Sequence, residues 1–263
     1  MNINNIEMPE LGLGTWRLSG QKCFDAVKIA LRLGYKHIDT AEMYGNHKEV
    51  GNAISGTNRK KFFLTSKVTP LNLSYNGVKN SCKKALSELG TDYLDLYLVH
   101  WPNPLFSIKE TFRAMEELKK DGKIRAYGVS NFTIKNLEDA KKYGDFLTNQ
   151  VEFHPYLYQK KLFNYCTEKG IVLTAYSPIA RGAVFKDEKI LAIGKKHKKT
   201  PGQISLRWLL DKKMIVIPKA STEEHIKENM EVFDFKLTKD DTDILDNLPQ
   251  KRIVNFGIRK WDD

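Results

Sequence analysis

The sequence has few cysteines and no long apolar run. Its three cysteines, Cys23, Cys82 and Cys166, are widely spaced and include no CxxC pair. This pattern argues against a disulfide framework or a cysteine-built zinc site, and it favours reduced thiols in the cytosol. The apolar run over residues 94–101 is far shorter than the roughly 18 residues of a membrane-spanning helix. Residues 1–9 lack the basic and apolar regions of a signal peptide, so we expect a cytoplasmic protein with no membrane partner.

The charge pattern is not that of a nucleic-acid-binding protein. The 263 residues include 43 Lys+Arg and 32 Asp+Glu, which gives a formal net charge of +11. The lysines are spread along the chain, and their densest run, over residues 195–199, is typical of a solvated helix face. No interleaved aromatic platform accompanies them, so we expect no nucleic-acid partner. With 41% hydrophobic and 29% charged residues, the composition excludes a disordered chain.

One unit recurs along the chain: an amphipathic stretch, a glycine and a short β-rich run. Gly34, Gly90, Gly122 and Gly170 stand where a left-handed cap ends a helix and returns the chain to a strand. The strands are apolar and β-branched, which is typical of a parallel sheet covered by helices. Eight strands are predicted, over residues 11–15, 37–39, 62–67, 93–99, 124–129, 148–153, 171–176 and 214–218.

Eight such units in 263 residues predict an α/β fold of the (β/α)8 TIM-barrel type. A capping box formed by Thr200 and Gln203, with Pro201 at the first helical position, predicts an extra helix through Leu210 before the last strand. No linker or composition break divides the chain, so we expect residues 1–263 to form one barrel domain. A doubly wound sheet and a two-domain arrangement are weaker alternatives.

Four reactive side chains lie at or just beyond the ends of predicted strands. In a barrel these ends form one rim, and the chemistry of barrel enzymes takes place there. Asp39, Lys67 and His100 end or follow strands, and Tyr44 lies five residues beyond Asp39. Taken singly, they could be a helix cap, a surface lysine, a core histidine and a loop aromatic. Together they bring a carboxylate, an ammonium, an imidazole and a phenol to one pocket.

These four groups could protonate the alkoxide that forms when a hydride reaches a carbonyl carbon. A phenol has a pKa near 10, which is high for acid–base chemistry at neutral pH. A lysine cation within a few Å favours the phenolate and lowers the pKa of the phenol. A carboxylate keeps that lysine charged and offsets its burial. The imidazole can donate a hydrogen bond to the carbonyl oxygen or orient it.

Seven segments extend this pattern over almost the whole chain. They are GLGTW (12–16), DTAEMYGNHKEVG (39–51), LVHWP (98–102), GVSNF (128–132), QVEFHP (150–155), AYSP (175–178) and IPK (217–219). In order and spacing the chain resembles the aldo-keto reductases, above all the short prokaryotic branch that includes diketogluconate reductases and aldehyde or aldose reductases. The resemblance implies an NADP-dependent carbonyl reductase, an alcohol dehydrogenase in the reverse direction. In it Tyr44 is the general acid, Lys67 lowers its pKa, Asp39 pairs with Lys67, and His100 orients the substrate carbonyl.

The resemblance also implies a nicotinamide cofactor that lies extended across the rim without a Rossmann fold. Ser130, Asn131 and Gln150 are expected to hydrogen-bond its carboxamide, and Tyr176 is expected to stack on its ring. The dinucleotide fingerprint itself is absent, because the GxG at residues 12–14 has no third glycine. The other expected cofactor contacts are Thr15, Trp16, Ser177, Ile179, Gly182, Pro218, Lys219, Ala220, Ser221, Thr222, His225, Glu228 and Asn229.

The segment expected to hold the adenosine 2′-phosphate departs from the family pattern. Ala220 replaces a serine, and His225 replaces an arginine. A neutral imidazole cannot make the bidentate, permanently charged contact of a guanidinium. Lys219 and a helix that begins at Ser221 still favour a phosphate. We therefore expect NADPH to be used, more weakly than is usual in the family, together with appreciable use of NADH.

The substrate pocket is expected to be walled by Trp16, Met43, Tyr44, His100 and Trp101, with Phe106 as a further candidate. A short loop after His100 and a short tail through residues 255–261 predict an open, apolar mouth for small aldehydes, dicarbonyls or sugar-derived carbonyls. A monomer is expected. Two alternatives remain: a cofactor-binding sensor without turnover and a metal-dependent barrel hydrolase. Of the six histidines only His100 and His154 stand at strand ends, so no metal is expected.

Overall fold

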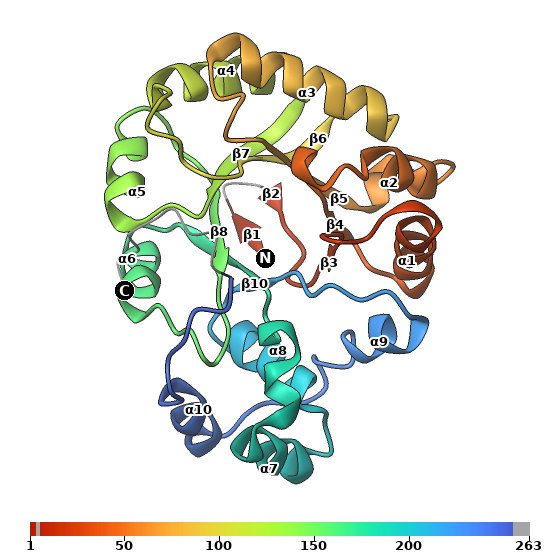
Figure 1. Ribbon diagram of the computed structural model, residues 1–263, viewed down its shortest axis with the longest axis vertical. Coiled ribbons are helices and arrows are strands. Elements are labelled where there is room, and N and C mark those ends of the chain that lie inside the picture. The colour runs from red at the N-terminus through yellow and green to blue at the C-terminus, as the bar shows by residue number, and fades with distance from the viewer. Residues whose placement is uncertain (4–5, 255–263) are drawn as a thin grey trace.

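The computed structural model describes residues 1–3 and 6–254. Eight parallel strands form the wall of a barrel (Figure 1). They are β3 (Leu13–Gly14), β4 (His37–Asp39), β5 (Phe63–Val68), β6 (Leu94–Val99), β7 (Ile124–Ser130), β8 (Thr148–Glu152), β9 (Val172–Tyr176) and β10 (Ile215–Val216). The expected tail over residues 255–261 lies outside the described residues.

Neighbouring strands in the sheet are also neighbours in the sequence, from β3 to β10. The first and last strands meet through a parallel bridge between Leu11 and Val216, where the Gly12 N–H donates to the Val216 carbonyl over 2.9 Å. The sheet therefore closes on itself. The predicted (β/α)8 barrel and its eight strands are confirmed, with shifts of one or two residues at some strand ends.

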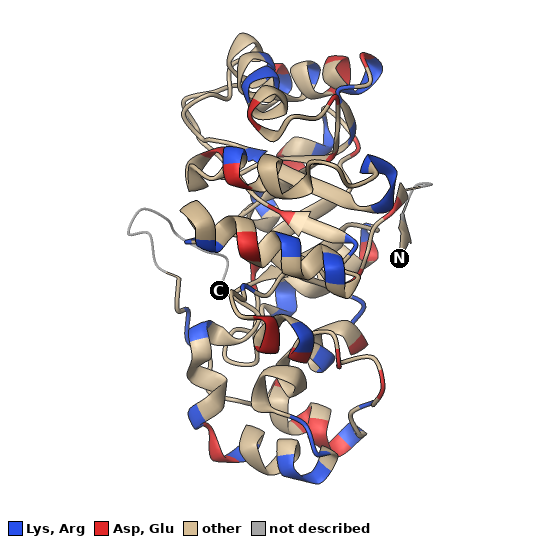
Figure 2. Cartoon of the chain, turned by 90° about the vertical axis from the view of Figure 1, so that its right-hand side faces the viewer, with Lys and Arg blue, Asp and Glu red and all other residues tan. Residues whose placement is uncertain are grey.

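Helices cover the outside of the barrel (Figure 1). They are α1 (Gly20–Leu33), α2 (His47–Ile54), α3 (Tyr75–Leu89), α4 (Ile108–Lys120), α5 (Ile134–Lys141), α6 (Lys160–Glu168), α7 (Glu188–His197), α8 (Pro201–Asp211), α9 (Glu223–Glu228) and α10 (Lys239–Asp246). Short 3-10 turns stand at η1 (Glu42–Tyr44), η2 (Arg59–Lys61) and η3 (Ala180–Lys186). Within the described ranges, none of the helices is long and apolar enough to cross a membrane. Figure 2 shows basic and acidic residues interspersed along the outer helices.

The local signals in the sequence explain where the helices begin and end. Gly34 and Gly90 end α1 and α3 at φ values of 98° and 61°, a left-handed conformation that glycine adopts at little cost. At the start of α8, Thr200 and Gln203 form the predicted reciprocal capping box, with Pro201 in the first turn. The extra helix before the last strand is therefore present.

An antiparallel hairpin closes the N-terminal end of the barrel, and the sequence did not predict it. It consists of β1 (Asn2–Ile3) and β2 (Ile6–Glu7), and it lies across the centre of the barrel in Figure 1. Met8 follows the hairpin and is fully buried against Phe63, Leu96 and Ile215 from three strands. The barrel is thus packed at this end, which leaves the opposite rim for a site.

We predict that Met8→Ala lowers the free energy of unfolding by about 2–5 kcal/mol, because it leaves a cavity among packed strands. The matched substitution Met43→Ala, at a side chain that is 57% exposed, should change it by less than about 0.5 kcal/mol. Urea unfolding of the two variants checks this. Equal losses of stability in the two variants would mean that the burial of Met8 contributes nothing particular to the barrel.

Candidate active site

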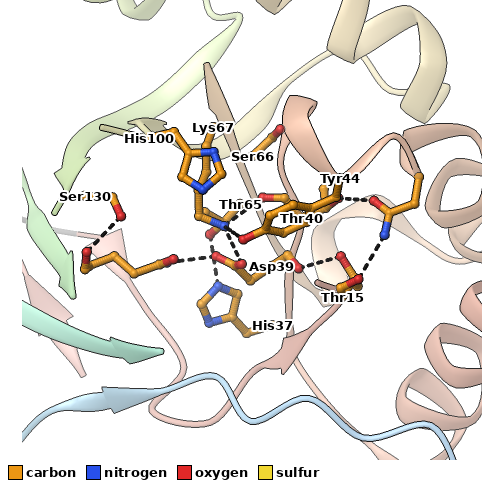
Figure 3. A network of polar contacts seen from close by, with 12 residues as sticks. Thr15, His37, Asp39, Thr40, Tyr44, Thr65, Ser66, Lys67, His100 and Ser130 are labelled. Carbon is orange, nitrogen blue, oxygen red and sulfur yellow. Dashed lines mark hydrogen bonds and ion pairs between the residues drawn. The ribbon is translucent and has the colours of Figure 1, made fainter. Parts of the chain in front are cut away.

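A cavity of about 1480 Å³ opens where the parallel strands end. Asp39, Tyr44 and His100 line it. Lys67, at the end of β5, lies directly beneath and is bonded to two of them (Figure 3). The four side chains singled out in the sequence therefore converge. Their catalytic roles stay a prediction.

Lys67 is held by three oxygen acceptors. Its Nζ donates to Asp39 Oδ1 over 2.5 Å, to the Thr40 carbonyl over 2.9 Å and to Tyr44 Oη over 3.3 Å. The side chains of Lys67 and Asp39 are 0% and 1% exposed. Three donors thus meet three acceptors, which satisfies the ammonium completely. Burial lowers the pKa of Lys67, and the charge of Asp39 acts in the opposite direction.

Asp39 is fixed on its other sides by Thr15 and Gln150. Gln150 Nε2 donates to Asp39 Oδ2 over 2.9 Å, and the Thr15 hydroxyl donates to the Asp39 carbonyl over 2.9 Å. Gln150 lines the cavity, whereas Thr15 is fully buried and does not. Thr15 was expected to contact a cofactor. In the structure its hydroxyl holds the backbone of Asp39, whose carboxylate bonds to Lys67.

Tyr44 stands on the turn η1, and its phenol stays protonated at neutral pH. Burial raises the pKa of Tyr44 well above its usual 10, and the charge of Asp39 acts in the same direction. The sequence predicted that Lys67 would lower this pKa. The pKa is raised overall, because burial and then the charge of Asp39 prevail, and the effect of Lys67 itself stays a prediction. A protonated phenol can donate a proton, and the ammonium beside it can stabilise the phenolate that forms.

His100 contacts Tyr44 edge to face, with ring centroids 5.6 Å apart and an interplanar angle of 77°. Burial and the neighbouring Lys67 charge lower the pKa of His100 well below its usual 6.5, so the imidazole is neutral at neutral pH. The Asn131 side chain donates to the His100 carbonyl over 3.1 Å and fixes the backbone there. A neutral imidazole carries one N–H, which can donate to a carbonyl oxygen in the cavity.

Most of the residues predicted to hold a cofactor line this cavity. Asn131 connects several of them: its Nδ2 donates to Ser130 Oγ over 3.0 Å, and its Oδ1 accepts from Tyr176 Oη over 2.9 Å. The predicted cofactor residues in the cavity wall are Trp16, Ser130, Asn131, Gln150, Tyr176, Ser177, Ile179, Gly182 and Lys219. Those outside the described wall are Thr15, Pro218, Ala220, Ser221, Thr222, His225, Glu228 and Asn229.

The segment predicted to hold the 2′-phosphate begins its helix one residue later than expected. Thr222, rather than Ser221, is the N-cap of α9, and its hydroxyl accepts from the His225 N–H over 3.4 Å. The His225 side chain is 64% exposed, with Nδ1 3.8 Å from Glu228 Oε2. Burial and the charge of Lys22 lower the pKa of Lys219, which is consistent with two ammonium groups near each other.

Two arginines that the sequence did not single out stack on Trp16. The guanidinium carbons of Arg17 and Arg181 lie 4.4 Å and 4.9 Å from the centroid of the indole ring. Arg17, Asn131, Ser177 and Arg181 all line the cavity with φ values of 50–62°, a conformation that costs energy in residues other than glycine. These residues stand in or beside the sequence motifs, but their strained backbone conformations could not be predicted, because strain leaves no signal in a sequence.

Glu152 is a second group that sequence reasoning missed. Its fully buried carboxylate accepts from the backbone N–H groups of Ile253 and Val254 over 2.8 Å and 2.9 Å, and it lies 3.0 Å from His154 Nε2. Burial alone would raise the pKa of Glu152, but these hydrogen bonds hold it below its usual value. Val254 lines the cavity, so Glu152 fixes the C-terminal side of the cavity wall.

The predicted substrate residues all reach the cavity. They are Trp16, Met43, Tyr44, His100 and Trp101, together with Phe106. Leu71 and Leu105, from the loops after β5 and β6, join them with side chains that are 75% and 87% exposed. These loops give the cavity an open, apolar mouth. Within the described residues, no group of three or more His, Cys, Asp or Glu is placed to hold a metal ion.

A further histidine lies in the barrel interior beneath the site (Figure 3). His37, in β4, is fully buried, and its Nε2 lies 2.9 Å from Thr65 Oγ1. Burial lowers the pKa of His37 to about 4, although the charges of Asp39 and Asp95 act in the opposite direction. His37 is therefore neutral in the folded protein at neutral pH.

Comparisons with known proteins agree with this geometry. The family model described as "Aldo/keto reductase family" matches residues 10–249. "Glyoxal reductase" of Bacillus subtilis (strain 168) is 44% identical over 250 residues, which cover 93% of this chain and 90% of that protein. "Aldose reductase B" of Dictyostelium discoideum is 38% identical, with coverage of 94% and 91%. A solved structure titled as a candidate 2,5-diketo-D-gluconic acid reductase B superposes with a TM-score of 0.95 at 39% identity, covering 99% of this chain and 96% of that chain.

We predict that His37 makes the stability of the protein depend on pH. Between its usual pKa of 6.5 and about 4, the unfolded chain takes up a proton that the folded protein does not. Stability is therefore lost as the pH falls through this window, by about 1.4 kcal/mol per pH unit. Between about pH 7 and pH 4.5, His37→Gln should lose about 2–3 kcal/mol less than the unsubstituted protein. Denaturant unfolding at both pH values measures this, and equal losses would contradict it.

Proposed function

Because the chain belongs to the Aldo/keto reductase family, we propose that it reduces aldehydes or ketones to alcohols by hydride transfer, with Tyr44 as the general acid. One observation carries the proposal. A fully buried ammonium, Lys67, is bonded at once to the Asp39 carboxylate and to the phenol of Tyr44 at the edge of a large cavity. A buried charge is costly, and here it stands beside the proton that the reaction needs.

The residues of the cavity fit a bound nicotinamide dinucleotide. The wall continues from Tyr44 past Tyr176 and Ser177 to the exposed Lys219, and Asn131 and Gln150 present amides along it. The aromatic face of Tyr176 matches the nicotinamide ring, and the two side-chain amides match its carboxamide. The Lys219 cation matches a phosphate group. The bound cofactor would supply the hydride.

The residues of this chain would then hold and transfer the proton. As a hydride reaches the carbonyl carbon, the carbonyl oxygen gains the electron pair of the broken π bond and takes the proton from Tyr44 Oη. The phenolate left on Tyr44 lies 3.3 Å from the Lys67 ammonium, which stabilises it. The neutral imidazole of His100 orients the carbonyl oxygen through its N–H. The raised pKa of Tyr44 keeps its proton available before the reaction.

The preferred cofactor is NADPH, with appreciable use of NADH. Lys219 and the nearby charge of Lys22 favour the 2′-phosphate. Ala220 has no hydroxyl to offer, and the exposed His225 side chain lies beside Glu228 with no permanent charge of its own. Because His225 stands in place of the family's arginine while Lys219 is kept, we expect a preference for NADPH over NADH below about a hundredfold, or about 2.7 kcal/mol.

The apolar mouth favours small aldehydes, dicarbonyls or sugar-derived carbonyls as substrates. Relatives named glyoxal reductase and aldose reductase B support this range. The proposal also takes residues 1–263 as one barrel domain that acts as a monomer in the cytoplasm. Cys23, Cys82 and Cys166 are buried free thiols, which is consistent with a reducing compartment.

We predict that Tyr44→Phe lowers kcat for aldehyde reduction by about 10²–10⁴, because the general acid is lost, while NADPH still binds. Tyr127→Phe is the matched control. It removes a phenol that donates to Glu116, away from the cavity, and should leave kcat unchanged. Steady-state NADPH oxidation with a panel of small aldehydes and dicarbonyls gives the rates. Saturable NADPH binding without turnover by the unsubstituted protein would instead favour a sensor.

We predict that His225→Arg raises the NADPH-to-NADH ratio of kcat/KM by about 10- to 100-fold, the value of one charged hydrogen bond. His225→Gln is the neutral control and should leave the ratio unchanged. Parallel assays with the two cofactors measure both variants. An unchanged ratio in His225→Arg would show that this position does not face the 2′-phosphate.

A further inference from the structure

Tyr44 stands on a short turn, none of whose three residues is fully buried, although the Tyr44 ring contacts His100 edge to face. The turn η1 has three residues, and its own backbone bonds are Tyr44 N–H to the Ala41 carbonyl and Gly45 N–H to the Glu42 carbonyl. Met43 is 57% exposed, so it does not anchor the turn. Yet the Tyr44 hydroxyl must stay within reach of Lys67. Polar contacts must therefore supply much of the rigidity.

Glu42, on the same turn, reaches across to the segment after β5. Its Oε2 accepts from the Thr69 N–H over 3.1 Å, and its Oε1 accepts from Asn72 Nδ2 over 3.2 Å and from Ser81 Oγ over 3.3 Å. Thr69 lies two residues beyond Lys67 in the sequence. The carboxylate thus connects the turn that carries the phenol to the strand end that carries the ammonium.

The other polar contacts near this turn lie on both sides of it. Before the turn, Lys67 Nζ donates to the Thr40 carbonyl, and the Thr40 hydroxyl donates to Asn46 Oδ1 over 2.8 Å. Asn46 Nδ2 donates to the carbonyls of Thr15 and Leu18, and His47 Nε2 lies 2.9 Å from Ser66 Oγ. Gly45 has a φ of 65° and separates both residues from Tyr44. Asn46 and His47 therefore fix the start of α2, and Asn46 also joins the two ends of the turn. Glu42 is the residue within the turn whose side chain bonds to the segment after β5.

We propose that Glu42 is a positioning residue that holds the Tyr44 hydroxyl against Lys67. The inference rests on the proposed role of Tyr44 as general acid. All three partners of Glu42 donate, so a carboxylate, which only accepts, satisfies every one of them. Glu42 touches neither substrate nor cofactor in this account. Its effect is geometric, and a displacement of about 1 Å at a reacting group can cost about 10²-fold in rate.

A charge relocation tests the contact. Asn72→Asp sets two carboxylates against each other, and we expect kcat to fall about tenfold or more. Glu42→Gln turns an amide donor toward another donor and should lower kcat by a smaller factor. The double variant Glu42→Gln/Asn72→Asp moves the negative charge from position 42 to position 72, so the net charge is that of the unsubstituted protein. An amide donor then faces a carboxylate acceptor again. Its kcat should return to within about threefold of the unsubstituted protein, a coupling that a double-mutant cycle isolates.

The matched control is Glu117→Gln. Glu117 is a carboxylate on α4 that accepts from Tyr75 and Lys79 on α3, away from the turn. The kcat of this variant should stay within about twofold of the value for the unsubstituted protein. NADPH dissociation constants should be unchanged in every variant, and thermal unfolding measured alongside separates positioning from a general loss of stability.

Crystal structures of the variants give a readout that does not depend on turnover. The Tyr44 Oη to Lys67 Nζ distance should exceed hydrogen-bonding range in Asn72→Asp and return to it in the double variant. An unchanged distance in Asn72→Asp, or a kcat within twofold despite lost stability, would overturn the proposal. If the unsubstituted protein reduces no carbonyl, the proposed function fails, and the crystallographic distance still decides the role of Glu42.

Discussion

A fully buried ammonium is the constraint on which the site depends. Lys67 can stay charged inside the barrel because Asp39, the Thr40 carbonyl and Tyr44 together meet its three donors. Removing one partner of such a buried pair typically costs about 3–5 kcal/mol, since the remaining charge has no compensation. Together with burial, which is the larger effect, the same ammonium lowers the pKa of His100. Burial and this one charge thus keep the imidazole neutral, and in the proposed mechanism the same charge stabilises the phenolate.

The barrel makes this arrangement possible by bringing distant parts of the chain to one rim. Asp39 and Lys67 end neighbouring parallel strands, and Gln150 reaches Asp39 from the opposite part of the wall. The hairpin before the barrel packs the other end and leaves the rim for chemistry. Strained residues such as Ser177 and Arg181 stand on the rim as well. Their conformations persist because the rigid strands beneath them restrict the loops.

Much of the fold could be predicted because its signals are local. Glycines such as Gly34 and Gly90 end helices, and apolar runs mark the strands between them. The convergence of Asp39, Lys67 and His100 followed from barrel geometry alone. The hairpin was missed because two-residue strands have no pattern. The net rise of the Tyr44 pKa could not be predicted, because it depends on burial. The bonds from Glu152 to the C-terminal segment could not be predicted either, because they join residues about a hundred positions apart.

The protonation states of the buried site are the most direct test of this account. Neutron diffraction from a deuterium-exchanged crystal at neutral pH would locate them. We expect three deuterons on Lys67 Nζ, one on Tyr44 Oη and none on Asp39. A neutral Lys67 amine beside a protonated Asp39 would contradict the account, because no charge would then be available to stabilise a phenolate.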